Sequence, residues 1–111
     1  EEFDGLMGGF VYSHVEKSQR SLFFDQILKR LKPKGQGLLL DNRYVAGSST
    51  PIHRTDAEGN TYQLRNLKDG STYEVLKNFP SEEEWDIFAK HEVSHYEWIT
   101  LDYYWMLTFV K

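Results

Sequence analysis

Two uninterrupted apolar segments on either side of one amphipathic segment constrain the fold of this sequence more than any other feature. Residues 3–11 and residues 37–40 are apolar runs of strand length. Between them, residues 18–32 carry apolar side chains at helical spacing, from Phe24 to Leu31. A strand, a helix and a second strand form a βαβ unit, and strands that are apolar throughout are typical of a parallel sheet covered on both faces. The sequence therefore predicts an α/β fold, and a single helix cannot cover both faces of its sheet.

Local signals indicate where this helix begins and ends. Ser18 has the short hydroxyl side chain that is typical of an N-cap residue. Residues 32–35 read Lys-Pro-Lys-Gly, a combination that ends helices and places positive charge at the C-terminal end of the helix dipole. Polar residues follow the second strand, so we expect the βαβ unit to occupy residues 1–44.

The middle of the chain is expected to leave this parallel sheet. Residues 45–78 form a loop followed by an antiparallel β excursion over residues 52–78. Glycine-containing turns at 56–60 and 68–70 separate segments in which polar and apolar side chains alternate. That alternation predicts antiparallel strands.

Residues 79–111 are expected to form a helix and a terminal β-hairpin. Ser81 and Glu84 have the spacing of a capping box at the start of that helix. The helix is expected to end near His91. The residues expected to face the core from it are Trp85, Phe88 and Ala89. The remainder is rich in β-forming residues and is interrupted around residues 101–102, which predicts two strands.

Length and composition exclude several classes of protein. The 111 residues allow one domain. The formal net charge is −4 without a block of Lys and Arg, which argues against a nucleic-acid partner. No apolar run approaches the ~20 residues of a membrane-spanning helix. The absence of cysteine excludes disulfides and thiolate metal sites, and it suits a reducing, cytoplasmic location.

Three segments resemble a known enzyme family. Residues 3–10, which begin Phe-Asp, resemble its fourth strand. Residues 11–15, Val-Tyr-Ser-His-Val, resemble a following segment that many members write as W-S-H-V/I. Residues 28–35 resemble the L-x-x-L-K-P-G-G turn before its fifth strand, with Lys34 in place of the first of the two glycines. In this order and spacing, the segments resemble the C-terminal half of a class I S-adenosylmethionine-dependent methyltransferase.

The resemblance implies a partial Rossmann-like sheet, made of strands four to seven with a C-terminal antiparallel hairpin. It also implies S-adenosylmethionine as the cofactor and a small molecule as the methyl acceptor. The family binds the cofactor mainly through a Gly-rich loop after its first strand, and the sequence contains no G-x-G-x-x-G. We therefore expect one incomplete domain that is inactive alone. We also expect its first strand to be an exposed edge that self-associates or pairs with the missing N-terminal half.

The resemblance implies two sets of site residues and no identifiable catalytic base. The residues implied beside the cofactor are Gly8, Gly9, Phe10 and His14. The residues implied at the acceptor are Tyr12, Asn42 and Arg43, and the guanidinium of the last could bind a carboxylate or phosphate.

Each of these roles has a structural alternative. The two glycines could instead mark a bend in a strand, where it approaches a neighbouring element. His14 could bond to backbone at a helix entry, Tyr12 could be a core ring, and Arg43 could form a surface ion pair.

Two other functional hypotheses stay open at this point. Residues 91–95 read H-E-V-S-H, which on a helix would place two histidines for zinc with a glutamate as base. The G-x-x-H continuation is missing, and the segment becomes β-rich, so a strand would separate the histidines. We therefore expect no metal site. The second hypothesis is a non-catalytic α+β binding domain built around the antiparallel excursion.

Overall fold

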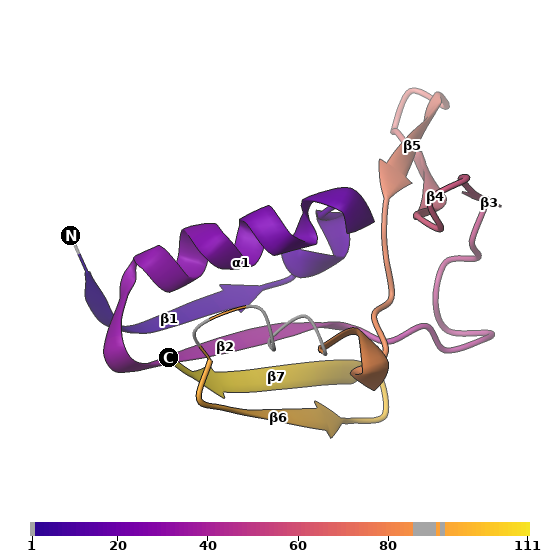
Figure 1. Cartoon of the computed structure of the whole chain (residues 1–111). Helices are drawn as coiled ribbons and strands as arrows, with labels where there is room; N and C mark the ends of the chain where they lie inside the picture. The colour runs from indigo at the N-terminus through magenta and orange to yellow at the C-terminus, as the bar shows by residue number, and fades with distance from the viewer. Residues whose placement is uncertain (1, 86–90, 92) are drawn as a thin grey trace.

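The computed structural model describes residues 2–85, 91 and 93–111. Its main sheet contains four strands, β1 (Phe3–Gly9), β2 (Leu31–Asn42), β6 (His95–Thr100) and β7 (Tyr104–Val110), in the order β1-β2-β7-β6. β1 and β2 are adjacent and parallel, with Leu6 opposite Gly37. β7 runs antiparallel to β2, and β6 runs antiparallel to β7. The predicted α/β sheet with a terminal antiparallel hairpin is confirmed (Figure 1).

The connection between β1 and β2 differs in detail from the predicted helix over residues 18–32. Two 3-10 turns, η1 (Tyr12–His14) and η2 (Lys17–Gln19), come first. The helix α1 (Arg20–Lys29) then begins with Gln19 at its N-cap position and without a side-chain capping bond. The prediction that Ser18 caps the helix was therefore wrong. Ser18 belongs to η2, because the chain winds more tightly before the α-helix begins.

The Lys-Pro-Lys-Gly segment also has a different role from the one predicted. The helix ends at Lys29, and Leu31 already pairs with Phe3 across the sheet. The next pair is Gly5 with Gln36, so residues 32–35 form an irregularity inside β2. A Cβ on Gly35 would lie 2.8 Å from the Lys32 carbonyl oxygen, which explains the glycine at this close approach.

One face of the main sheet carries the hydrophobic core. Alternate side chains of β2 and β7 point to this face, and α1 covers it (Figure 1). The core consists of the buried residues Tyr12, Phe24, Leu28, Leu31, Leu39, Trp85, Trp105, Leu107 and Phe109. The Phe109 ring lies over Gly37, where a Cβ would come within 2.2 Å of it. Burial of these large rings supplies most of the apolar stabilisation of the fold.

The opposite face of the sheet is open in the described part of the chain. Met7 is 72% exposed, and Leu38, Leu40 and Met106 are partly exposed. Among the described strands, β1 has only β2 as a neighbour and therefore forms an edge of the sheet. The apolar run at residues 3–11 is typical of a buried strand, but most of these residues are exposed, in agreement with the expectation that the first strand forms an exposed edge. Few atoms of the described residues cover β1, because it lies at the edge of the sheet and one face of the sheet is bare.

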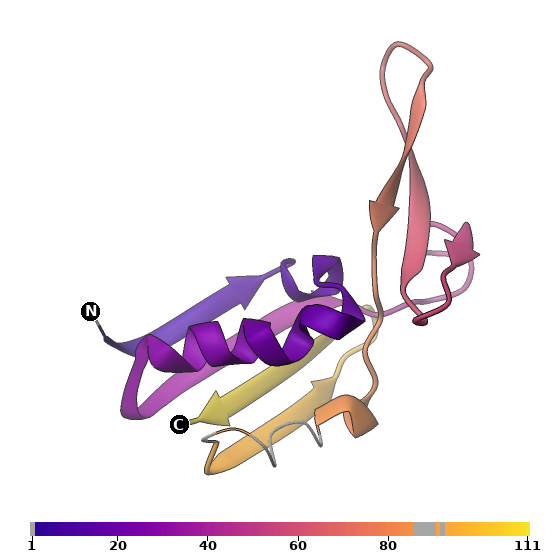
Figure 2. The same cartoon turned by 45° about the horizontal axis from the view of Figure 1, so that its top comes forward.

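The predicted antiparallel excursion is also confirmed. β3 (Arg54–Thr55), β4 (Thr61–Asn66) and β5 (Thr72–Leu76) form a separate three-stranded antiparallel sheet. Gly59 and Gly70 have φ angles of +87° and +89° in the two predicted turns. Figure 2 shows this second sheet projecting from the end of the main sheet, and the whole molecule measures 48 × 28 × 28 Å.

The segment before the hairpin is described only in part. Residues 82–85 form a 3-10 turn, and Trp85 is fully buried, as predicted for an inward-facing residue. The predicted inward positions Phe88 and Ala89, and most of the predicted helix, lie outside the described residues. The Glu84 carboxylate pairs with the Arg20 guanidinium. In the described ranges, no helix is long and apolar enough to cross a membrane.

Candidate functional site

The carboxyl ends of the two parallel strands meet at one end of the main sheet. β1 ends at Gly9 and β2 at Asn42, and the turn η1 follows directly after β1. The excursion β3–β5 projects from the same end, as Figure 2 shows. In open α/β sheets, ligands bind outside the carboxyl ends of parallel strands. This end of the molecule is therefore the first place to look for a site.

The three residues predicted beside a cofactor at the end of β1 lie in different surroundings. A Cβ on Gly8 would lie 3.0 Å from the Leu39 side chain, so packing within the protein accounts for this glycine. A Cβ on Gly9 would meet nothing within 4 Å. Phe10 has a φ angle of +60°, which is rare for a bulky residue, and its ring is 49% exposed. Gly9 and Phe10 together leave space at the strand end that the described protein atoms do not fill.

His14, also predicted beside the cofactor, connects η1 to the excursion. Its Nδ1 donates a hydrogen bond to the carbonyl oxygen of Leu76, at 2.6 Å. Because a carbonyl can only accept, Nδ1 carries the proton, and Nε2 is the remaining ring nitrogen of this exposed side chain. The bond to backbone that was considered as an alternative is therefore present at Nδ1. A contact between Nε2 and a cofactor stays a prediction.

Tyr12, predicted at the acceptor, lies in the aromatic core. It is 2% exposed, and its ring centroid lies 5.4 Å from that of Trp85 and 5.9 Å from that of Trp105. The Arg20 guanidinium lies over the same ring at 5.3 Å. Burial raises the pKa of the Tyr12 phenol. These contacts are the ones expected if Tyr12 is a core residue. A contact between Tyr12 and a substrate stays a prediction.

A buried charge network that the sequence analysis did not identify holds the excursion against the strand ends. Lys77 Nζ donates to Asp41 Oδ1 at 2.9 Å, to Ser13 Oγ at 3.0 Å and to Asn42 Oδ1 at 3.1 Å. Asp41 is fully buried and also accepts the Ser13 backbone N–H at 3.0 Å. The only sequence signal was a carboxylate directly after the apolar run of β2. Nothing in the pattern of the excursion marked Lys77 as its partner.

The same contacts determine the ionisation of Asp41. Burial is the largest single influence on its pKa and acts upward. Hydrogen bonds from Ser13, Lys77 and the Asn42 backbone act downward, and together they hold the pKa of Asp41 below its ordinary value. Asp41 is therefore a carboxylate that neutralises Lys77, and it is a structural group rather than a candidate base.

Two asparagines add a second connection between the excursion and the turns after β1. Asn60 Oδ1 accepts the Lys17 backbone N–H at 2.8 Å and the Asn78 side-chain amide at 3.0 Å. The Asn78 amide also donates to the Val15 carbonyl oxygen, at 3.1 Å. Both asparagines are buried, so these bonds satisfy groups that water does not reach.

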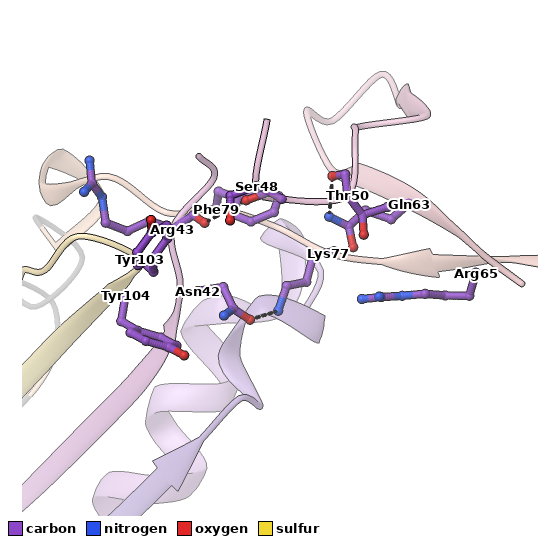
Figure 3. Close-up of a pocket in the computed structure, with 11 residues that line it drawn as sticks. Asn42, Arg43, Ser48, Thr50, Gln63, Arg65, Lys77, Phe79, Tyr103 and Tyr104 are labelled. Carbon is purple, nitrogen blue, oxygen red and sulfur yellow. Dashed lines mark hydrogen bonds between the residues drawn. The ribbon is translucent and has the colours of Figure 1, made fainter. Parts of the chain in front are cut away.

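A cavity of about 300 Å³ lies between the excursion and the ends of β2 and β7. Its lining residues are Asn42, Arg43, Ser48, Ser49, Thr50, Gln63, Arg65, Lys77, Phe79, Tyr103 and Tyr104 (Figure 3). The predicted acceptor residues Asn42 and Arg43 are thus brought together here. The volume is at the lower end of the range for small-molecule sites. Sequence reasoning did not identify Arg65 or the two tyrosines, because they join the cavity only through the tertiary fold.

Aromatic contacts link this cavity to the end of β1. The Tyr104 ring lies edge-on to the Phe10 ring, with 6.1 Å between their centroids. Phe79 lies similarly against Tyr44, at 5.3 Å. Tyr104 therefore borders both the cavity and the strand end where Gly9 leaves open space.

The H-E-V-S-H segment does not bring its histidines together. His91 Nδ1 lies 3.1 Å from an Asp25 carboxylate oxygen, on α1. His95 begins β6, and its Nε2 lies 3.5 Å from a Glu97 carboxylate oxygen. Glu92 lies outside the described residues. The described residues contain no group of three or more His, Asp or Glu side chains that could hold a metal ion, so the zinc-peptidase hypothesis gains no support from them.

The comparisons with known proteins identify the fold. No family model matches the sequence, and no curated protein shows a significant match. The structure resembles a DhpI complex with SAH, with a TM-score of 0.71 and 18% identity over 97% of this chain and 47% of that chain. It also resembles the PH0226 protein from Pyrococcus horikoshii OT3, with a TM-score of 0.66 and 16% identity over 98% of this chain and 54% of that chain.

A third similar structure is that of an enzyme whose name states its activity. The glycopeptide N-methyltransferase MtfA complexed with S-adenosylmethionine matches with a TM-score of 0.63 and 13% identity, over 98% of this chain and 57% of that chain. This chain therefore has a class I S-adenosylmethionine methyltransferase-like fold. It spans about half the length of the solved structures that it matches.

Proposed function

We propose that the protein is an S-adenosylmethionine-dependent methyltransferase that acts on a small molecule. In this proposal, the chain is the C-terminal half of the catalytic domain and supplies the acceptor pocket and one wall of the cofactor site. The observation that carries the proposal is the cavity between the excursion and the ends of β2 and β7, on a methyltransferase-like fold. Through Tyr104 this cavity is joined to Phe10, which directly follows β1. Its volume of about 300 Å³ suits a small acceptor.

The residues at the end of β1 fit the wall of a cofactor site. No atom of the described residues lies within 4 Å of the position that a Cβ on Gly9 would occupy, and the adjacent Phe10 has a left-handed backbone conformation with an exposed ring. Unfavourable backbone conformations of this kind are concentrated at functional sites. The bound cofactor would supply a methyl group on a positively charged sulfur.

The chain's own residues would position the acceptor and exclude water around it. Transfer of a methyl group requires an aligned nucleophile in a desolvated site, and positioning alone can account for a large part of the rate. Tyr104 and Phe79 would exclude water from the cavity, and the Asn42 amide could orient a polar group of the acceptor. We assign no catalytic base.

Cofactor binding tests the proposal directly. Titration calorimetry of the complete gene product with S-adenosylmethionine should show binding in the unmodified protein. Gly9→Ala should weaken that binding by about tenfold, because ~1.4 kcal/mol is lost when a methyl group occupies ligand space. Gly5→Ala is the matched control, because it lies on the same strand with only ordinary contact to the Gln36 carbonyl oxygen at 3.8 Å.

A complete gene product that binds no S-adenosylmethionine would contradict the proposal. A non-catalytic α+β binding domain would then be the better interpretation.

The exposed surfaces of the main sheet lead to a second expectation. The free edge of β1 and the bare face around Met7, Leu38 and Val110 line a hollow of about 560 Å³. Exposed edges and apolar faces favour association. We expect the 111-residue chain alone to self-associate, or to pair with the other half of the domain, and to lack methyl transfer. Light scattering on the isolated chain tests this, and a monomer at every concentration would contradict it.

A further inference from the structure

The cavity beside the excursion has an unbalanced charge. Among the described residues that line it, three carry cationic side chains, Arg43, Arg65 and Lys77, and none is an Asp or a Glu. We propose that this cavity binds an anionic group of the methyl acceptor, a carboxylate or a phosphate, and that Arg65 is the residue that holds it. The identification of the ligand as the acceptor rests on the function proposed above.

Lys77 is not available for this role. An ammonium group has three hydrogens to donate, and those of Lys77 are directed to Ser13, Asp41 and Asn42. Its charge is also neutralised by the buried Asp41 carboxylate, at 2.9 Å. Lys77 therefore forms the floor of the cavity and contributes little net charge to it.

Arg43, which the sequence analysis proposed for an anion, is directed elsewhere. Its Nη1 donates to the carbonyl oxygens of Leu101 at 2.7 Å and Asp102 at 3.2 Å, in the turn between β6 and β7. In Figure 3 its guanidinium points away from the other lining side chains. Arg43 therefore lines the cavity, but its guanidinium is bonded to the turn between β6 and β7.

Arg65 is the remaining cation, and it has no counter-ion in the described part of the chain. It lies on β4 opposite Tyr73 and is partly buried, and its side chain has no hydrogen bond or ion pair to any described residue. In Figure 3 its side chain extends from β4 toward Lys77, with the guanidinium at the inner end. A partly buried guanidinium without a partner offers a planar pair of N–H donors that matches a carboxylate or phosphate.

The placement of Arg65 also indicates how the acceptor would lie. Arg65 and Tyr104 are at opposite sides of the group of side chains in Figure 3, and Tyr104 contacts Phe10 near the open end of β1. An acceptor held by its anionic group at Arg65 would direct its other end toward Phe10. The excursion would therefore select acceptors by charge, while the strand ends would position the reacting atom.

Anion binding can be measured without any cofactor. In the complete gene product, titration with inorganic phosphate and separately with acetate should shift the Arg65 Nε–H resonance in NMR spectra. The matched control, the exposed Arg30 at the C-cap of α1, should show no saturable shift. Arg65→Gln should weaken binding of the preferred anion about tenfold or more, which corresponds to ~1.4 kcal/mol or more, whereas Arg30→Gln should not.

The outcomes separate this inference from the proposed function. Arg65→Lys should retain part of the binding, because it keeps the charge and loses the planar fork. A stronger response to phosphate or to acetate identifies which anion the acceptor carries. If S-adenosylmethionine binds but neither anion shifts Arg65, or if both Gln variants weaken binding equally, the inference is wrong and the proposed function stands. If Arg65 binds an anion but the complete protein binds no S-adenosylmethionine, the proposed function fails, and the assignment of the ligand as an acceptor fails with it.

Discussion

The main sheet and the excursion sheet are stabilised by different interactions. The main sheet packs α1 against β2 and β7 through buried rings and leucines. The excursion buries mainly polar side chains, including Asn60, Gln63 and Lys77, and is joined to the rest of the chain by hydrogen bonds. Apolar packing depends on volume and tolerates small shifts, whereas a buried polar network requires every partner in place.

This difference bears on the cavity, because the cavity lies where the two regions meet. Its floor comes from the polar network and its aromatic wall from the hairpin of the main sheet. The position of the excursion, and hence of Arg65, depends on Lys77 and its partners. We therefore expect core substitutions to change stability, and junction substitutions to change both stability and the shape of the site.

The largest effect is expected in the core of the main sheet. Trp105 is 1% exposed, and its ring lies 5.2 Å from that of Trp98. Trp105→Ala should lower the free energy of unfolding by about 4 kcal/mol, because a large cavity replaces the ring. Urea unfolding measures this. The control Tyr103→Ala, in the same hairpin but 54% exposed, should change it by less than about 0.5 kcal/mol.

At the junction between the excursion and the main sheet, removing the charge of Lys77 should lower the free energy of unfolding by nearly as much. Lys77→Met removes the partner of the buried Asp41 and should cost about 3 kcal/mol, because an uncompensated carboxylate stays buried. The second substitution Asp41→Asn, added to Lys77→Met, should recover part of that loss. If the two single variants and the double variant are simply additive in urea unfolding, Asp41 and Lys77 are not coupled.

The next largest effect is expected when the pH is lowered, because the junction between the two regions contains the buried carboxylate of Asp41. In the folded chain the pKa of Asp41 is below its ordinary value, so the unfolded chain takes up a proton at higher pH. The stabilisation by Asp41 is complete at neutral pH and is lost as the pH falls below about 4 and through the folded pKa. The urea midpoint of the unmodified protein should decline more steeply between pH 5 and 2 than that of Asp41→Asn. Parallel declines would contradict the role of this network.

The smallest effect is expected at the end of β1. Gly8→Ala should lower stability by about 1 kcal/mol, because its new methyl group presses on Leu39 at 3.0 Å. Gly9→Ala should raise stability by about 0.5 kcal/mol, because the new methyl group meets no atom of the described residues and restricts the unfolded chain. Equal effects in thermal unfolding would show that the two glycines do not differ in surroundings.

Local sequence patterns predicted the elements but not all of their ends. The two apolar runs, the amphipathic segment and the glycine turns indicated β1, α1, β2 and the excursion. From the apolar pattern the helix was predicted to continue to Lys32. Helix propensity contains no information on the pairing of Leu31 with Phe3 across the sheet. The strand ladder competes with the last helical turn for the same backbone groups, and the outcome depends on a residue far away in the sequence.

The candidate site was predicted less completely than the fold. Asn42 and Arg43 were expected at the acceptor, and both line the cavity, although the Arg43 guanidinium turns to the carbonyl oxygens of the β6–β7 turn. Arg65 was not expected there, because an arginine on a strand of alternating polar and apolar residues carries no sequence signal for a binding site. Its significance comes from Lys77 being fully paired and Arg43 being turned away, and no one-dimensional pattern contains either fact.

Sequence alone determined the strand–helix–strand order, the turns and the hydrophobic alternation of this protein, since these depend on backbone preferences and on side chains a few residues apart. Only the tertiary structure decided that Lys77 meets Asp41, that Tyr12 lies in the core and that Arg65 faces a cavity. These outcomes depend on burial and on partners far away in the sequence; the Lys77–Asp41 bond, for example, joins residues 36 positions apart. The free energy of a buried charge is decided by such partners, and not by its neighbours in the chain.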